Sequence, residues 1–426
     1  MLNGELLLES VQTPGVMSAK LLLPRGSGHD RIGNRGAHQL LASLLTRGCG
    51  PYDHNGIADL VEGCGAGLRS DAHEDGLMIS LRCCSDDAPK LIPILDWMIH
   101  QPLLQEDQLQ LERSLSLQTL QRQQEDPFQL AFDGWRNLAY GDGGYGHDAL
   151  GLADELETLE LSVLEPLLRN LQASKGVLAI AGQWPSDLEK LLSEMIRPPE
   201  KADESANQDV FSAERDVPKN TINLDSIDTE QVVIMLGQPT IPHGHPDALG
   251  LRLLQCHLGY GMSSMLFRRL REDHGVAYDV GIHHPNRLRA SPFVLHASSG
   301  AEKAELALGL LCEVWNELSE VCLSNNDLEL AHSKFIGQLA HSRQTCSQRA
   351  ERRAQLHRFR LPESHDQDCL EQIQTISSSD LRRIARDHLT TPKLSLCGPR
   401  ALLTKLNKSW NDQRSAVWIN LQHRDR

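Results

Sequence analysis

The stretch from Leu258 to Tyr278, LGYGMSSMLFRRLREDHGVAY, changes its residue pattern several times within a short span. It predicts a glycine-rich turn, a short helix over 264–273, a glycine stop at Gly275 and a strand over 276–282. Two residues stand out against this scaffold, Arg271 near the end of the helix and Tyr278 in the strand. The mixture of a helix and a strand in one compact segment indicates an α+β fold.

The pattern around this stretch occurs twice in the chain. In the first half it predicts a strand, two helices, two strands about a turn at 70–73, and two longer helices, at 16–23, 36–46, 57–62, 67–83, 88–100 and 106–124. The second half repeats this order at 231–236, 247–258, 264–273, 276–282 with 292–297, 302–322 and 327–341. The offset is 211 between Gly48 and Gly259 and 210 between Gly65 and Gly275. This repeat predicts two homologous α+β domains, each a mainly antiparallel sheet covered by helices on one face.

The domain boundaries follow from composition. Residues 200–218 are polar and proline-bounded, as in an exposed linker, so we expect one domain at 1–199 and the other at 219–426. Residues from about Arg400 onward form a polar tail with an amphipathic piece that the pattern does not place.

Charge and hydropathy exclude several classes of function. The net charge of −15 argues against a nucleic-acid-binding surface. No apolar run reaches the roughly 18 residues of a membrane span, and Met1–Glu5 lacks the basic start of a signal peptide. The ten cysteines include no CxxC pair, which favours reduced thiols in a cytoplasmic protein. Cys83 and Cys84 are neighbours on a predicted strand and face opposite sides, so we assign them no redox role.

The order of elements resembles the insulinase/pitrilysin family (M16) of zinc metallopeptidases over nearly the whole chain. The resemblance rests on 36–48, on Asp126-Pro127 with the Tyr140–Gly146 segment, and above all on 258–278. It implies repeated α+β domains of the fold seen in mitochondrial processing peptidases.

Catalytic members of that family carry an inverted H-x-x-E-H motif on the first helix, where two imidazoles bind zinc and the glutamate activates water. Aligned on Gly48, this chain has Gln39, Ala42 and Ser43 at those positions. The resemblance places the third ligand, a glutamate, within 118–121, where the sequence is Gln-Thr-Leu-Gln. We therefore expect a degenerate zinc site, with no metal and no catalytic residue on this chain.

Other histidines are expected to be structural. His38 is interpreted as a helix-surface or cap-region residue. His243 and His245 flank a glycine beside prolines, and His283-His284 follows a strand, so both pairs are interpreted as loop residues without a metal.

The resemblance also implies an Arg/Tyr pair that holds substrate, and this pair maps onto Arg271 and Tyr278. The alternative is that Arg271 is a solvated helix end and Tyr278 a buried strand residue. At an offset of 210 the first-domain counterparts are Val61 and Leu68, so the scaffold alone accepts apolar side chains there. This comparison favours a role in binding.

Gly259 and Gly261 have two interpretations of equal weight. They allow a substrate backbone to approach closely, or they form an ordinary turn between helices.

Together these features predict the non-catalytic, substrate-binding subunit of a heterodimeric zinc metallopeptidase. A catalytic insulinase-family partner with an intact H-x-x-E-H would supply zinc, and the substrate would be a peptide. A scaffold or peptide-binding protein without a role in proteolysis is the main alternative, an independent enzyme with an unrecognised site is a weaker one, and a homodimer stays open.

Overall fold

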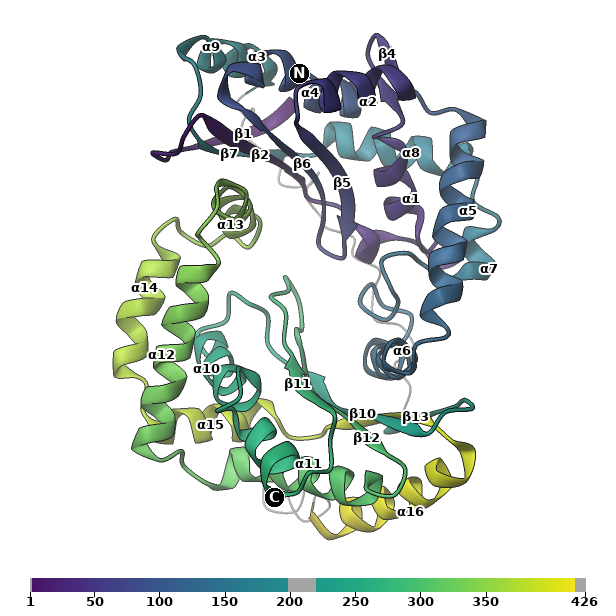
Figure 1. The fold of residues 1–426 in the computed structure, drawn as a ribbon, viewed down its shortest axis with the longest axis vertical. Helices are drawn as coiled ribbons and strands as arrows, with labels where there is room; N and C mark the ends of the chain where they lie inside the picture. Colours follow the sequence, from purple (N-terminus) through teal and green to yellow (C-terminus); the bar gives the residue numbers. More distant parts are fainter. Residues whose placement is uncertain (1, 198–219, 418–426) are drawn as a thin grey trace. The chain divides into compact units, whose positions relative to one another are not determined.

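The computed structural model describes residues 2–197 and 220–417, so the predicted linker at 200–218 lies outside the described residues. The chain folds into two compact units. Among the described residues, unit 1 comprises 2–121, 142–197 and 340–363, and unit 2 comprises 122–141, 220–339 and 364–417. The units are therefore not the two linear halves 1–199 and 219–426, because each includes one segment of the other half (Figure 1).

Unit 1 is built on a mixed six-stranded sheet with the order β5-β6-β2-β7-β1-β8. Its strands are β1 (Leu2–Ser10), β2 (Val16–Leu23), β5 (Gly67–His73), β6 (Gly76–Cys84), β7 (Gly176–Gly182) and β8 (Ile196–Arg197). The pairs β5–β6, β6–β2 and β2–β7 are antiparallel, whereas β1 runs parallel to both β7 and β8. A separate short hairpin joins β3 (Gly48–Cys49) to β4 (Tyr52–Asp53).

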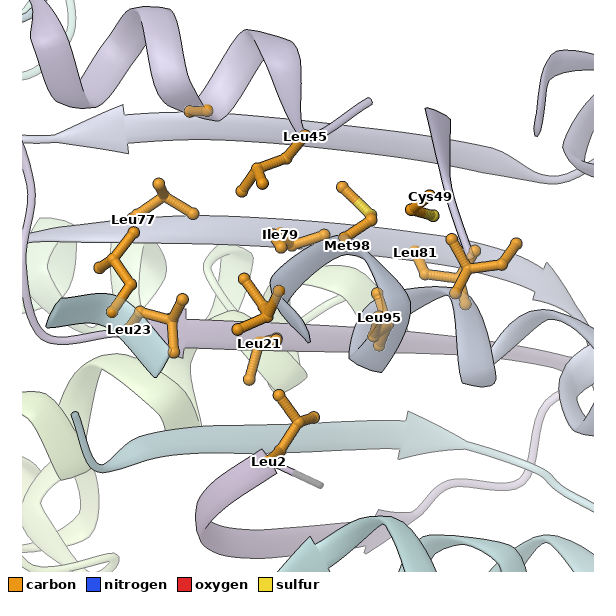
Figure 2. Packing of buried hydrophobic residues seen from close by; sticks show 14 of the residues in the cluster. Leu2, Leu21, Leu23, Leu45, Cys49, Leu77, Ile79, Leu81, Leu95 and Met98 are labelled. Atoms are coloured by element: carbon orange, nitrogen blue, oxygen red, sulfur yellow. The ribbon is translucent and has the colours of Figure 1, made fainter. Parts of the chain in front are cut away.

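Helices of the first half cover one face of this sheet. They are η1 (Ser27–His29), α1 (Ala37–Leu44), α2 (His54–Gly63), η2 (Ser85–Asp87), α3 (Ala88–Leu91), α4 (Pro93–His100), α5 (Glu106–Gln123), α7 (Ala153–Leu156), α8 (Leu161–Ala173) and α9 (Ser186–Met195). Apolar residues at alternate positions of β2 and β6 meet residues of α4 and of the end of α1 in the core between the layers, as Figure 2 shows for Leu21, Ile79, Leu95 and Leu45.

The opposite face of the sheet is not bare, because α13 (Cys346–Arg358) from the second half packs on β2 and β7. Ala350 and Ala354 of this helix are fully buried against Leu22 and Val177. This packing explains why β2 is buried at nearly every position although Ser18 and Lys20 interrupt its apolar pattern. The expectation of helices on one face only was therefore wrong.

Unit 2 repeats the plan with a five-stranded sheet in the order β11-β12-β10-β13-β9. Its strands are β9 (Ile222–Ser226), β10 (Gln231–Pro239), β11 (Asp279–His283), β12 (Pro292–Gly300) and β13 (Lys393–Gly398). Only β9 and β13 pair in parallel, as β1 and β7 do in unit 1. One face carries α10 (Ala248–Gly259), the π-helix η4 (Phe267–Asp273), α11 (Ala304–Glu320), α12 (Asn325–His341), α14 (His365–Gln372), η5 (Ile373–Thr375), α15 (Ser378–His388) and α16 (Arg400–Val417).

The helix α6 (Pro127–Tyr140) takes the place in unit 2 that α13 takes in unit 1, because it packs on β10 and β13. Asp126 caps α6 through a bond from Phe128 N at 2.9 Å, and Thr345 caps α13 in the same way from Gln348 N at 3.2 Å. Trp135 of α6 is fully buried, and its Nε1 donates to Gly237 O at 3.2 Å. The two repeats thus exchange equivalent helices.

The α+β fold with two homologous sheets is confirmed, while several boundaries differ. The hairpin turn lies at Glu74-Asp75 rather than at 70–73, because Ser70 and Asp71 pair with Ile79 and Met78 in the ladder. The strand expected over 276–282 begins at Asp279. The region after Arg400 is not a tail, since Leu406 and Trp410 of α16 are fully buried in the core of unit 2.

Candidate functional site

The three positions of α1 that the resemblance assigns to the H-x-x-E-H motif are occupied by Gln39, Ala42 and Ser43. Gln39 Oε1 accepts a hydrogen bond from Ala72 N at 2.8 Å, which ties the helix to β5. Ala42 is fully buried in the core, and Ser43 is half-buried. An amide engaged with the backbone, a methyl group and a hydroxyl do not make the set of two imidazoles and a carboxylate that binds catalytic zinc.

Of the two expected placements of His38, the cap region is the observed one, since it is the second residue of α1 and its side chain is only 1% exposed. Its Nδ1 lies 2.5 Å from Asp30 Oδ1. The same carboxylate accepts the backbone N–H groups of Gly36 at 2.9 Å and His38 at 3.2 Å. Asp30 therefore satisfies the amino end of α1 and fixes the ring of His38 at the same time.

Helix α5 offers no carboxylate at the expected third position. Thr119 donates to Leu115 O of its own helix at 2.9 Å, and Leu120 is buried in the core. The buried acid of this helix is Glu112, and its carboxylate forms an ion pair with Arg47 just beyond α1. In the whole sequence no two histidines stand four residues apart, so an H-x-x-E-H motif occurs nowhere in it.

The helix η4 carries three arginines with different surroundings. Arg268 Nη2 lies 3.1 Å from Asp327 Oδ1, and Arg269 Nη1 lies 2.7 Å from Glu317 Oε1, beside a cleft of about 560 Å³. Arg271 is exposed, and its Cζ lies 5.1 Å from the ring centroid of Phe267. Within 2–197 and 220–417, no ion pair of Arg271 with a carboxylate is present. Its guanidinium donors are therefore available to a ligand.

Tyr278 is exposed as well, with 65% of its surface accessible. Its backbone N–H donates to Ser298 O at 2.8 Å, so the backbone is fixed beside β12 while the ring stays outside the core. The interpretation of Tyr278 as a buried strand residue is therefore wrong. Tyr260 and Met262 of the same stretch are also exposed, at 45% and 75%. The stretch therefore exposes two aromatic rings, a methionine and a guanidinium to solvent.

The comparison with Val61 and Leu68 does not hold in the structure. Gly65 and Gly275 do match, since both have φ of 58°. The residue that is buried like Val61 is Leu270, however, so the wider turns of the π-helix shift the register by one residue. In the sheets, Leu68 pairs with Leu81 and Val280 with Ala297, at corresponding places of the nine-residue strands β6 and β12. Arg271 thus corresponds to Glu62. Tyr278 has no fixed counterpart, because five residue steps separate Gly275 from Val280 and only three separate Gly65 from Leu68.

The two glycines of the stretch have distinct structural roles. A Cβ on Gly259 would lie 2.3 Å from Ile282 Cγ2, so glycine is needed where α10 packs on β11. Gly261 has φ of 78° and open space around its Cα, as expected for a turn residue. Both observations explain a turn, and the open space at Gly261 also leaves room for a bound chain.

The histidine pairs have different surroundings. His283 packs its ring on Phe132 at 4.7 Å, and His284 Nδ1 contacts Pro292 O at 2.7 Å. Burial lowers the pKa of His284 to about 4. His245, by contrast, lies close to Asp247 and His388, a grouping that the sequence did not reveal because His388 is 141 residues from Asp247.

The fold and the site define a duplicated α+β protein with Gln39, Ala42 and Ser43 on the first helix of one repeat and an exposed Arg and Tyr in the other. Comparison with known proteins specifies the class. The sequence profile "Insulinase (Peptidase family M16)" matches residues 6–150, and "Peptidase M16 inactive domain" matches residues 168–335. The chain is therefore a homologue of the peptidase M16 (insulinase) family.

Some relatives are described as zinc proteases, and one is described as a non-peptidase homologue. An uncharacterized zinc protease of Streptomyces coelicolor is 25% identical over 415 residues, covering 93% of this chain and 88% of the relative. A non-peptidase homologue of Helicobacter pylori is 23% identical over 399 residues, covering 89% and 90%. The crystal structure of a peptidase M16 inactive domain from Pseudomonas fluorescens has a TM-score of 0.81 at 22% identity, covering 93% of this chain and 96% of that one.

A chain of complex III from Candida albicans has a TM-score of 0.75 at 14% identity, covering 95% of this chain and 96% of that chain. At this identity the likeness establishes the fold alone. Among the helices that the structure describes, none combines the length and the apolar character needed to cross a bilayer.

Proposed function

We propose that this chain is the non-catalytic, substrate-binding subunit of a heterodimeric zinc metallopeptidase. A partner of the same family with an intact H-x-x-E-H supplies the zinc and the general base. This chain contributes Arg271 and Tyr278, with Gly259 and Gly261 shaping the turn beside them. The observation that carries the proposal is the contrast between the two repeats: Gln39, Ala42 and Ser43 leave no metal-binding set, while Arg271 and Tyr278 are exposed.

The contrast among the arginines of η4 supports the role of Arg271. Arg268 and Arg269 are held by Asp327 and Glu317, so their charges serve the scaffold. Binding of a ligand to Arg271 breaks no ion pair. Its planar guanidinium can donate two hydrogen bonds to peptide carbonyls or to a carboxylate. The phenol of Tyr278 can donate one further bond to a carbonyl oxygen.

Reconstitution with the partner tests this function. The chain and a catalytic family member from the same source are mixed, and hydrolysis of a fluorogenic peptide library is followed. We expect activity only in the mixture, and we expect Arg271→Ala combined with Tyr278→Phe to lower kcat/KM by about tenfold to a thousandfold, as loss of aligned donors does. Arg268→Ala is the matched control, because the charge of Arg268 is already paired with Asp327.

The alternative is a scaffold or peptide-binding protein, which the relative described as a non-peptidase homologue makes worth testing. This alternative predicts a stable complex whose turnover is unchanged by substitution of Arg271 and Tyr278. If the double variant reconstitutes full activity, the substrate-binding role is wrong. If the chain elutes as a homodimer and binds no catalytic partner, the heterodimer is wrong.

A further inference from the structure

In unit 2, the loop before α10 and the end of α15 bring two imidazoles and a carboxylate together. His388 Nε2 lies 2.8 Å from Asp247 Oδ2, and the rings of His245 and His388 are 5.4 Å apart, nearly perpendicular. One ligand atom from each of His245, Asp247 and His388 lies within 4.8 Å of the others. All three residues are partly exposed, so an ion can reach them from solvent.

We propose that His245, Asp247 and His388 bind a divalent transition-metal ion of the Zn²⁺ class, separate from any catalytic zinc of a partner. Two imidazoles and one carboxylate are a ligand set that suits Zn²⁺ and Co²⁺. Bonds of about 2.0–2.1 Å to a tetrahedral ion separate its ligand atoms by roughly 3.3 Å. The pair at 2.8 Å needs only a small outward shift, and the ligand atom of His245 lies within 4.8 Å of both.

The helices that carry the three residues favour a bound cation at this position. His388 is the last residue of α15, where the carbonyl end of the helix dipole attracts a cation. Asp247 directly precedes α10, so its backbone is fixed by the helix. His245 Nδ1 accepts the backbone N–H of Asp247 at 3.1 Å, and ligation by His245 through either nitrogen gives up or rearranges this one bond.

Arg383 is the competing cation at this site. Its Nη2 lies 2.9 Å from Asp247 Oδ1 and its Nη1 lies 3.3 Å from Oδ2, while its side chain is 44% exposed. The bond to Oδ1 is compatible with a metal ion on Oδ2. The contact to Oδ2 is not, so the guanidinium must shift toward Asp387, which Nη1 already contacts at 3.3 Å. Removal of Arg383 is therefore expected to strengthen metal binding, whereas removal of a ligand weakens it.

The test titrates the purified full chain with Zn²⁺ by isothermal calorimetry and with Co²⁺ by visible absorption. We expect one equivalent to bind, the affinity to fall by more than about tenfold in His245→Ala and in His388→Ala, and to rise in Arg383→Ala. His274→Ala removes an exposed histidine elsewhere on unit 2 and is expected to bind as the wild type does. Far-UV circular dichroism and urea midpoints of each variant separate loss of a ligand from loss of folding.

Two outcomes overturn the proposal. One is equal Zn²⁺ binding by the wild type and the His245→Ala/His388→Ala double variant. The other is a loss of affinity in a folded Arg383→Ala variant as large as in the ligand variants. The proposal does not rest on the proposed function, because metal binding is measured on the chain without a partner and peptidase activity is measured with Arg271 and Tyr278 variants.

Discussion

Lys20 and Glu351 lie on opposite sides of the chain's midpoint, yet Lys20 Nζ is 3.1 Å from Glu351 Oε2. Lys20 belongs to β2 and Glu351 to α13, and both are part of unit 1. The ammonium also donates to Ser80 Oγ at 2.9 Å. The exchanged helix is therefore held to the sheet by a charge-assisted contact in addition to the apolar cluster around Ala350 and Ala354.

Glu351→Gln is expected to destabilise unit 1 by about 1–2 kcal/mol, because it leaves the buried ammonium of Lys20 without its counter-charge. The side chain of Glu351 is 40% exposed, and water therefore limits the effect. Urea unfolding measures the change. The double variant Lys20→Met/Glu351→Gln should regain stability, since no buried charge remains.

Glu363→Gln is the control for that experiment. Glu363 pairs with Arg353 at 2.7 Å, but its side chain is 70% exposed. We expect a change below about 0.5 kcal/mol. Equal losses in the Glu351 and Glu363 variants would contradict a specific role of the Lys20 contact.

Gly259→Ala is expected to destabilise unit 2 by about 1–3 kcal/mol, because the new methyl group would overlap the side chain of Ile282. Gly261→Ala meets open space and is disfavoured only by its positive φ, at roughly 1 kcal/mol. Thermal unfolding of both variants gives the comparison. A larger loss at Gly261 would show that the packing of α10 on β11 tolerates the methyl group.

Sequence periodicity predicted the repeated order of strands and helices because each element buries one continuous apolar face. It could not predict the exchange of α6 and α13, since an amphipathic helix does not specify which of two similar sheets it covers. For the same reason the polar residues Ser18 and Lys20 in β2 had no explanation until α13 provided a partner for Lys20.

The candidate site was predicted only in part. The residue types of α1 can be read directly from the sequence, whereas the bond from Ala72 N to Gln39 Oε1 depends on the packing of α1 against β5. The counterpart of Arg271 was assigned wrongly, because a constant offset cannot detect the extra residue within the π-helix. The counterpart of Tyr278 was assigned wrongly because two further residues lie between Gly275 and β11. The group of His245, Asp247 and His388 depends on tertiary packing of α10 on α15, which no local pattern encodes.

Thiol reactivity should divide the cysteines by burial. Burial raises the pKa of the thiols of Cys49, Cys83, Cys312 and Cys397 to about 12. Cys84 and Cys322 are exposed, and all ten cysteines are free. Ellman's reagent is expected to show a fast phase of two thiols in the native chain that disappears in Cys84→Ser/Cys322→Ser. A fast phase that persists in this variant would mean that half-buried Cys64 or Cys346 is more accessible than the structure indicates.

His257 should make unit 2 sensitive to acid. Its side chain is 8% exposed, and burial lowers its pKa to about 4, with Arg268 and Lys334 acting in the same direction and Asp327 opposing them. The folded state therefore keeps this imidazole neutral, whereas the unfolded chain takes up the proton near pH 6.5. Stability from this group is complete above about pH 6.5 and is lost as the pH falls toward 4, by up to about 3 kcal/mol.

Urea unfolding between pH 7.5 and 4 measures this dependence. His257→Gln cannot be protonated in this range, so the variant should lose less stability on acidification than the wild type does. Its stability at pH 7.5 serves as the reference, because any difference there reports packing around position 257 and not protonation. Parallel stability curves for the wild type and the variant from pH 6.5 down to 4 would show that proton uptake by His257 is not linked to unfolding of unit 2.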